Sequence, residues 1–225
     1  EYRQTGENFD WVQMSDQRLI GSVAEGRFGS SVAISPDGTL IAAGSPLSSI
    51  FVVYEWVDME WRMLFSGSAP GGNTNEEFGS SLAFLSNKHI AVGGPGAFNE
   101  AGVVRVYELM PNRLFQQIGP DITGGNGDRI GSSNSLSGIV FSDDRPAVAV
   151  GTNTGAVKRY DYNQNRGEWL QRYETVNTGS GAASSVAMIT DGPASTFVVG
   201  TEGSDEILIY EAFLGWTSSP AASVT

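Results

Sequence analysis

Short runs of apolar residues alternate along the whole chain with turn-forming Gly, Pro, Asp and Asn. Between positions 27 and 65 the runs read SSVAIS, LIAAGS, IFVVYEW and EWRMLF, and they are rich in Val, Ile and aromatic residues. Such runs, bounded by signals such as Pro36-Asp37-Gly38, are typical of β-strands joined by tight turns. No segment shows a convincing apolar period of 3.6 residues, which would predict a helix packed on a core. The pattern therefore predicts an all-β protein.

The same set of four runs recurs about every 50 residues. A Gly-Ser-Ser step begins at Gly29, Gly79 and Gly131 and returns as Ala-Ser-Ser at Ala183, with spacings of 50, 52 and 52. The tyrosine that ends the third run recurs with spacings of 53, 53 and 50, at Tyr54, Tyr107, Tyr160 and Tyr210. Four antiparallel strands repeated at this period are the signature of a β-propeller, whose blades are four-stranded sheets. We therefore expect a β-propeller with about four visible repeats and a partial unit at the N-terminus.

The repeat boundaries predict a single propeller domain over residues 1–216. Its units lie at about 17–65, 66–118, 119–173 and 174–216, with 1–16 as a partial blade. The Pro-, Ala- and Ser-containing stretch 217–225 is expected to be a linker or a disordered tail. Two arrangements stay open: the ring closes within this chain, or the chain is a segment of a longer propeller.

Residue size within each unit predicts how the blades pack. The first two runs are dominated by Ala, Ser, Gly and Val, whereas the fourth carries large side chains. This gradient fits a wedge that is narrow at the axis and wide at the rim. Phe28, Phe78 and Ile130, each just before a first strand, are expected to fill the seams between blades. The rim positions are expected to be Trp11, Trp61, Phe115, Trp169 and Trp216.

Two units carry a Phe-Gly step followed about 15 residues later by a Gly-containing turn. These are Phe28-Gly29 with Gly44-Ser45-Pro46 and Phe78-Gly79 with Gly93-Gly94-Pro95. The pattern resembles a divergent FG-GAP repeat of integrin α-chain propellers, and the phrase SPDGTLIAAGS also resembles WD-repeat blades. The FG-GAP resemblance implies a propeller that binds ligands on one face and that often holds Ca²⁺ between its first two strands. The corresponding loops here contain at most two carboxylates each, so no structural metal is expected. Asp37-Gly38 is expected to form a hairpin turn instead.

The charge and the residue types present exclude several kinds of partner and site. A formal net charge of −12 argues against nucleic acid or an anionic membrane as the main partner. The chain has no Cys, which rules out disulfides, thiol nucleophiles and Cys-ligated metals. No apolar run approaches the length of a membrane span, so no direct membrane insertion is expected. Acidity, the missing initial Met and the resemblance favour an extracellular or lumenal location.

No catalytic constellation stands out in the sequence. His89 is the single histidine and lies in NKHIAVGG, so neither a conventional zinc site nor a Ser-His-Asp triad has the residues it needs. We expect it to be a turn or surface histidine. Acidic residues recur after the strand tyrosines in every unit, which marks them as part of the repeat architecture. The sequence therefore predicts a protein that is not an enzyme and that has no catalytic residue, cofactor or metal.

The long polar loops that interrupt the repeat are the candidate binding surface, because loops on a rigid scaffold commonly carry binding residues. Propeller topology places the loops before each first strand and those between the second and third strands on one face. We expect a non-enzymatic module that binds a protein partner or acts as a structural subunit through this long-loop face. The alternatives are a carbohydrate-binding propeller with a glycan ligand, a hydrolase using carboxylates outside the repeat, or solvated loops without a partner. The candidate residues are Asn73, Asn75, Glu76, Glu77, Phe98, Asn99, Glu100, Asp128 and Arg129.

Overall fold

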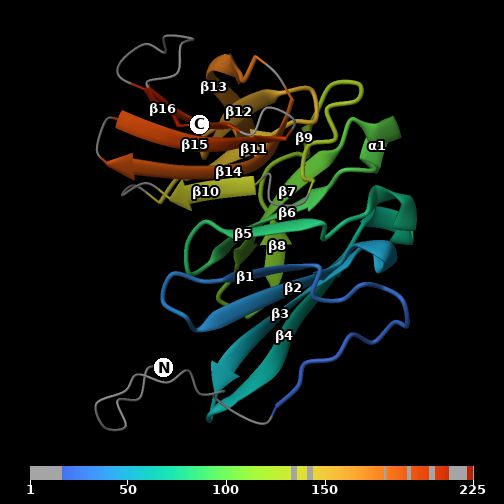
Figure 1. Ribbon diagram of the computed structural model, residues 1–225. Coiled ribbons are helices and arrows are strands. Elements are labelled where there is room, and N and C mark those ends of the chain that lie inside the picture. Colours follow the sequence, from blue (N-terminus) through green and yellow to red (C-terminus); the bar gives the residue numbers. More distant parts are fainter. Residues whose placement is uncertain are drawn as a thin grey trace, which may run out of the picture.

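The chain folds into four antiparallel sheets that follow one another in an arc (Figure 1). The computed structural model describes residues 17–132, 136–140, 144–179, 181–191, 194–202, 206–212 and 222–224. Within each sheet four strands pair in chain order as a meander, and in one sheet a short fifth strand also pairs with the third. This is the arrangement of propeller blades, and it confirms the predicted all-β propeller fold.

The strand bounds follow the predicted runs closely. Sheet 1 contains β1 (Ser31–Ile34), β2 (Leu40–Ser45), β3 (Ile50–Val57) and β4 (Glu60–Ser68). Sheet 2 contains β5 (Ser81–Phe84), β6 (His89–Gly94), β7 (Val103–Leu109), β8 (Phe115–Gln117) and β9 (Ile122–Thr123). Sheet 3 contains β10 (Leu136–Val140), β11 (Pro146–Gly151), β12 (Ala156–Asn163) and β13 (Glu168–Asn177). Sheet 4 contains β14 (Ala182–Asp191), β15 (Ala194–Glu202), β16 (Glu206–Ala212) and β17 (Ala222–Val224).

Short helical turns lie in the loops between strands. They are η1 (Pro46–Ser48), η2 (Pro70–Gly72), η3 (Thr74–Glu76) and α1 (Ala97–Glu100). Within the part of the chain that the structure describes, none of the helices has the length and apolar character needed to span a membrane.

The turn between β1 and β2 shows how local chemistry ends the strands. The Asp37 carboxylate accepts hydrogen bonds from the Ser35 hydroxyl at 2.6 Å and from the Thr39 backbone N–H at 3.0 Å. These hydrogen bonds lower the pKa of Asp37, and the bond from Ser35 has the largest effect. Gly38 has a φ of 72°, which a residue without a Cβ adopts at little cost. The prediction of a hairpin turn at Asp37-Gly38 is thus confirmed.

The fourth strand of sheet 2 is interrupted. β8 pairs with the end of β7, and β9 pairs with its beginning. Pro120 lies between them and has no N–H to give to the ladder, so pairing stops there. The neighbouring Asp121 is thereby free to turn its side chain toward β7, where it meets Arg105.

Apolar clusters fill the seams between consecutive sheets. Phe78 and Ile130 are completely buried, in the seams between sheets 1 and 2 and between sheets 2 and 3 respectively, as predicted. At the rim, Phe115 packs in the first of these seams and Trp169 in the second. Trp61 instead contacts Trp56 of its own sheet, with ring centroids 5.1 Å apart. Trp11 and Trp216 lie outside the described residues.

Near the axis, a serine and a glycine join each inner strand to the next sheet. Ser31 Oγ donates to the Gly79 carbonyl at 2.7 Å, and Ser81 Oγ donates to the Gly131 carbonyl, also at 2.7 Å. The same carbonyls lie against Gly44 and Gly93, where a Cβ would overlap them. The repeated Gly-Ser-Ser step and the glycine that ends each second strand are therefore two sides of one inter-sheet contact.

The structure tests the prediction for the C-terminal end of the chain but not the one for the N-terminal end. In place of the linker or disordered tail expected at 217–225, residues Ala222–Val224 form β17, which pairs with β16 as the fourth strand of sheet 4. The backbone of β16 at Ile207–Ile209 is the edge with which this strand pairs. The predicted partial blade at 1–16 lies outside the described residues.

We predict that Gly93→Ala lowers the free energy of unfolding by about 1–3 kcal/mol, the usual cost of forcing a group into a filled contact. The added methyl would overlap the backbone of Gly131 and separate sheets 2 and 3 near the axis. Urea unfolding followed by tryptophan fluorescence measures the change. Gly125→Ala is the control, because its Cβ would meet nothing closer than 3.3 Å. Equal stability of the two variants would contradict the proposed role of the contact.

Candidate functional site

The meander topology gives the arc two opposite faces, each formed by the loops at one end of the strands. The loops before each first strand and those between second and third strands lie at one end, which we call the long-loop face. The turns between first and second strands and between third and fourth strands lie at the other, which we call the short-turn face. The candidate residues of the sequence analysis belong to the long-loop face.

The structure brings three of the predicted loops together through Arg129. Its guanidinium donates to Glu77 at 3.0 Å and to Glu100 at 2.8 Å. Its backbone N–H also donates to the Glu100 carbonyl at 3.0 Å. Residues from the loops around 76, 100 and 129 are therefore neighbours, as the topology predicted, but their charges pair with one another.

Glu76 and Asp128 are buried and serve as counter-ions for cations on the third strands. Arg105 of β7, itself buried, donates to Glu76 at 2.9 Å and to Asp121 at 2.8 Å, and lies 5.1 Å from the centre of the Phe78 ring. Lys158 of β12 donates to Asp128 at 2.6 Å. Each acid stands two residues before the seam-filling Phe78 or Ile130, so sheets 2 and 3 repeat the same ion pair.

Burial by itself raises the pKa of Asp128. The Lys158 ammonium, the Gly125 N–H and the Thr154 hydroxyl outweigh that effect and lower the pKa overall. Asp128 is therefore charged at neutral pH and stabilises the fold in its ionised form. The sequence analysis missed both Arg105 and Lys158, although cations on third strands occur only where an acid precedes the seam residue.

The remaining long-loop candidates are exposed. The Asn73 side chain accepts from the Asn75 N–H at 3.1 Å and so closes its own turn. Phe98 is 57% exposed, and Phe98, Asn99 and Glu100 all have φ between 52° and 65°. The structure thus places the nine predicted residues on one face, in which the described acids Glu76, Glu77, Glu100 and Asp128 all pair with cations of the chain.

His89 is buried, which corrects the expectation that it could be a surface histidine. Its Nδ1 lies 3.0 Å from Ser86 Oγ, and its Nε2 lies 3.8 Å from Glu108. Burial lowers the pKa of His89, and Glu108 only partly opposes this shift. The Ser86 hydroxyl also accepts from the backbone N–H groups of Lys88 and His89, both at 3.2 Å, so it is a turn residue.

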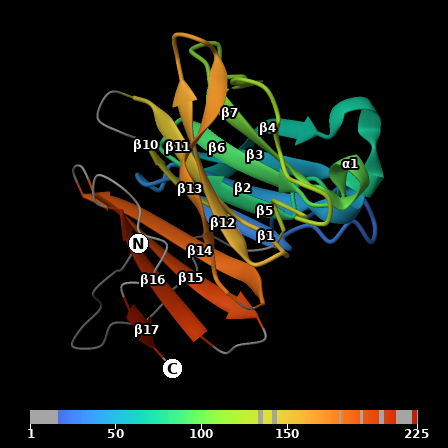
Figure 2. The same cartoon turned by 90° about the horizontal axis from the view of Figure 1, so that it is seen from above.

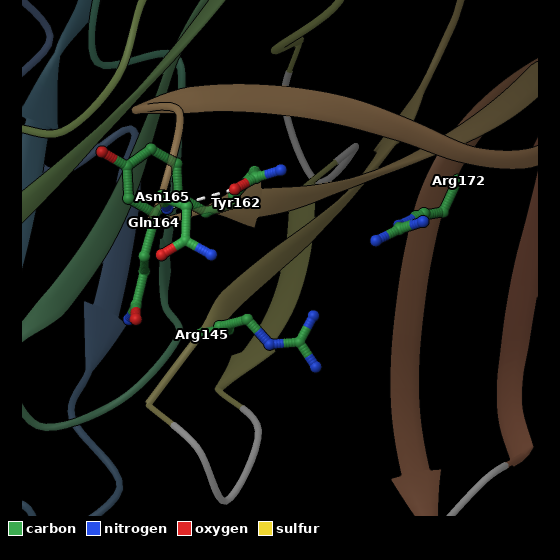
Figure 3. A pocket seen from close by; sticks show the side chains of 6 residues that line it. Arg145, Tyr162, Gln164, Asn165 and Arg172 are labelled. Carbon is green, nitrogen blue, oxygen red and sulfur yellow. Dashed lines mark hydrogen bonds between the residues drawn. The ribbon is translucent and has the colours of Figure 1, made fainter.

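A pocket of about 370 Å³ lies on the short-turn face of sheet 3 (Figure 3). It is formed where the end of the β10–β11 turn meets the β12–β13 turn. Figure 3 shows Arg145 between the amide side chains of that second turn and Arg172 of β13. The lining residues are Arg145, Tyr162, Asn163, Gln164, Asn165 and Arg172.

Hydrogen bonds within the β12–β13 turn hold the amides in place. Asn163 Oδ1 accepts from the backbone N–H of Asn165 at 3.1 Å and of Arg166 at 3.2 Å. Gln164 Nε2 donates across to the Asp144 carbonyl at 3.3 Å, which joins the two turns. The Tyr162 ring packs on Trp169 with centroids 5.0 Å apart. The pocket wall is therefore built from paired strands and an internally bonded turn.

The lining is positively charged although the protein is strongly acidic. It includes two guanidinium groups and no carboxylate. Arg172 Nε lies 3.6 Å from Asp161, but Asp161 is engaged more closely by Arg159 at 2.8 Å. Arginine and side-chain amides together favour a small anion with hydroxyl or phosphate oxygens. Among the described residues, no group of three His, Asp or Glu side chains gathers as metal ligands do.

The sequence analysis did not identify this pocket, because its residues form no recognised motif. One signal was present: Arg145 occupies the turn between first and second strands, where an FG-GAP calcium loop would need carboxylates. A cation in that turn fits an anion better than it fits calcium.

Comparison with known proteins shows similarity at the level of the fold. No protein-family model and no curated protein matches the sequence. Among solved structures, hydrazine synthase of Kuenenia stuttgartiensis matches with 12% identity and a TM-score of 0.56, over 92% of this chain and 52% of that chain. Two proteins described as "putative 6-phosphogluconolactonase" also match. That of Bacteroides uniformis has 15% identity, a TM-score of 0.55 and coverage of 88% and 57%. That of Bacteroides fragilis has 11% identity, a TM-score of 0.57 and coverage of 87% and 56%.

These similarities support the propeller fold and correct the predicted function. The chain spans little more than half the length of these structures. They are described as enzymes, which contradicts the expectation of a non-enzymatic interaction or structural subunit, with a carbohydrate-binding propeller as its alternative. The FG-GAP relationship and the extracellular or lumenal location stay predictions.

We predict that Lys158→Met lowers the free energy of unfolding by about 3 kcal/mol at pH 7, because it leaves the buried Asp128 carboxylate without its cation. In the native protein the lowered pKa means that the stabilisation from Asp128 is present above its unfolded pKa of 3.8 and is lost as pH falls through the folded value. The difference between variant and native protein should therefore persist down to about pH 3.8 and shrink as pH falls below it, through the lowered folded value. Urea unfolding at several pH values measures it.

The matched control is Lys88→Met, which removes a half-exposed ammonium that pairs with Glu108 and Asp144. It should cost less than about 1 kcal/mol, as partly solvated ion pairs do. A pH-independent loss in Lys158→Met would show that lost packing, and not the uncompensated charge, causes the effect.

Proposed function

We propose that this propeller belongs to a hydrolase and that its short-turn pocket binds the anionic group of a small substrate. The observation that carries the proposal is the pair Arg145 and Arg172 in a pocket without a carboxylate, on a chain with a net charge of −12. The field of such a chain repels anions, so two guanidinium groups beside one pocket mark the place where an anion is best accommodated.

The substrate class we propose is a phosphorylated sugar lactone. The structural neighbours described as 6-phosphogluconolactonases support this class, and the pocket's chemistry agrees with it. Guanidinium groups bind phosphate oxygens in a bidentate manner, and the amides of Gln164 and Asn165 suit sugar hydroxyls. The volume of about 370 Å³ is within the range of small-molecule sites.

Hydrolysis of a lactone adds water to the ring carbonyl carbon and breaks the bond to the ring oxygen, which takes up a proton. Negative charge develops on the carbonyl oxygen as water adds. A guanidinium group already held in the pocket stabilises that charge without reorganising, which is the largest contribution in many acyl-transfer enzymes. With one of the two guanidinium groups, Arg145 or Arg172, on the phosphate, the other is the group of this pocket that can play that part.

The test measures 6-phosphogluconate binding by isothermal titration calorimetry and 6-phosphogluconolactone hydrolysis above the uncatalysed rate. Arg145→Leu and Arg172→Leu should each weaken binding about ten- to a hundredfold, the loss expected for a charge-assisted hydrogen bond. Arg166→Leu is the matched control. It lies on the same turn, pairs with Glu168 at 3.3 Å and does not line the pocket.

The outcomes separate the two parts of the proposal. Absence of binding, or equal weakening in the Arg166 control, would remove the anion site. Binding without lactone turnover would remove the hydrolase and leave an anion-binding propeller.

A further inference from the structure

Every seam inside the arc joins two different faces. Each sheet has a preceding face, which is turned toward the sheet before it in the chain, and a following face, which is turned toward the sheet after it. In each seam the following face of one sheet packs on the preceding face of the next. We call the contact closest to the axis the glycine notch. In that notch a glycine at the end of a second strand receives a carbonyl from the start of the next sheet. The notches are Gly44 with Gly79, Gly93 with Gly131, and Gly151 with Ala183.

Both halves of one more notch are present and lack a partner within the described chain. Gly200 stands at the position of Gly44, Gly93 and Gly151, but a Cβ there would meet only the Ser185 side chain. Gly29 stands at the position of Gly79, and no described atom lies within 4 Å of where its Cβ would be. Gly200 therefore has the residue type that the contact requires, although no carbonyl of the described residues approaches it.

Apolar exposure on the two end sheets agrees with this. In sheet 2, Leu82 and Phe84 pack into the seam with sheet 1. The equivalent residues of β1, Val32 and Ile34, are 72% and 62% exposed. At the other end of the arc, Val198 of β15 lies on the following face of sheet 4 and is 38% exposed.

The exposure includes the inner strands and also reaches outer strands of the same faces. On sheet 1 Val52 and Tyr54 are buried, whereas β1 and Met63 of β4 are open. On sheet 4 Ile207 of β16, which pairs with Gly200, is 49% exposed. On sheet 4, Ser185 and Val198 lie on the same face as Gly200, since Ser185 pairs with Gly200 and Ala187 with Val198. The open regions thus include the two unfilled halves of the notch.

We propose that a second copy of this chain fills both open faces, with sheet 4 of one copy packed on sheet 1 of the other. Sheets 1 and 4 lie at opposite ends of the arc, as two perpendicular views show (Figure 1, Figure 2). A twofold axis along the propeller axis brings each end against the complementary end of its partner. Ser185 then donates to the Gly29 carbonyl of the other copy, as Ser31 donates to Gly79 within the chain.

The size of the related structures agrees with this assembly. This chain matches 52–57% of each of them, so two copies supply about the length of one. The twofold arrangement also closes on itself, because both open faces of both copies are used. It leaves no exposed end on which further copies could add.

The test is the oligomeric state of the 225-residue chain by sedimentation velocity over a range of concentrations. We expect a reversible dimer. Ile34→Glu and Val198→Glu should each raise the dimer dissociation constant at least about tenfold, because each places a charge in an apolar seam. Gly200→Ala should do the same, since its methyl fills the notch while only a serine side chain lies near it in the monomer.

Met59→Glu is the control, because Met59 is a still more exposed apolar residue, at 79%, and lies in the turn between β3 and β4, away from both faces. Circular dichroism checks that each variant is folded. A chain that stays monomeric at its highest soluble concentration overturns the proposal. The open faces of sheets 1 and 4 would then be covered by other blades or by the remaining residues of the chain. A dimer that Ile34→Glu disrupts and Val198→Glu does not also overturns it, because like faces would then be paired.

Discussion

Each sheet approaches its neighbour so closely near the axis that there is no space for a side chain, and the rest of the structure depends on this contact. Ser31 and Ser81 bond to carbonyls of the next sheet, and Gly44 and Gly93 leave the space that those carbonyls occupy. The sheets diverge from there, and large side chains such as Phe78 and Trp169 fill the widening gap. Close packing at both radii requires small residues inside and large ones outside.

Ion pairs between loop acids and cations of the third strands hold the loops of the long-loop face in position. Arg105 and Lys158 lie on third strands and engage acids from the loop that precedes the first strand of the same sheet. A buried charge is tolerated only when it is paired, so each cation fixes the loop that carries its counter-ion. Arg129 then links the loops to one another. Residues that look like ligand-binding groups in the sequence therefore hold the loops in position.

The short-turn face is different, because its pocket gathers positive charge that the chain as a whole lacks. The β12–β13 turn is internally bonded, and Gln164 joins it to the Asp144 carbonyl beside Arg145, so the amides of that turn project from a fixed base. A preformed site of this kind loses little entropy when it binds a ligand. The positive charge of its lining is what supports the proposed binding of a small anion.

The sequence by itself determined the repeat, the strands, the seam residues Phe78 and Ile130 and the turn at Asp37-Gly38, because these follow from local periodicity, residue size and turn chemistry. It also placed the long loops on one face. Only the tertiary structure decided which charges meet. Glu76 and Asp128 became counter-ions of residues about 30 positions away, His89 became buried, and Arg145 and Arg172 were brought to one pocket. Pairing between distant side chains depends on the register and the stacking of whole sheets, which no local pattern records.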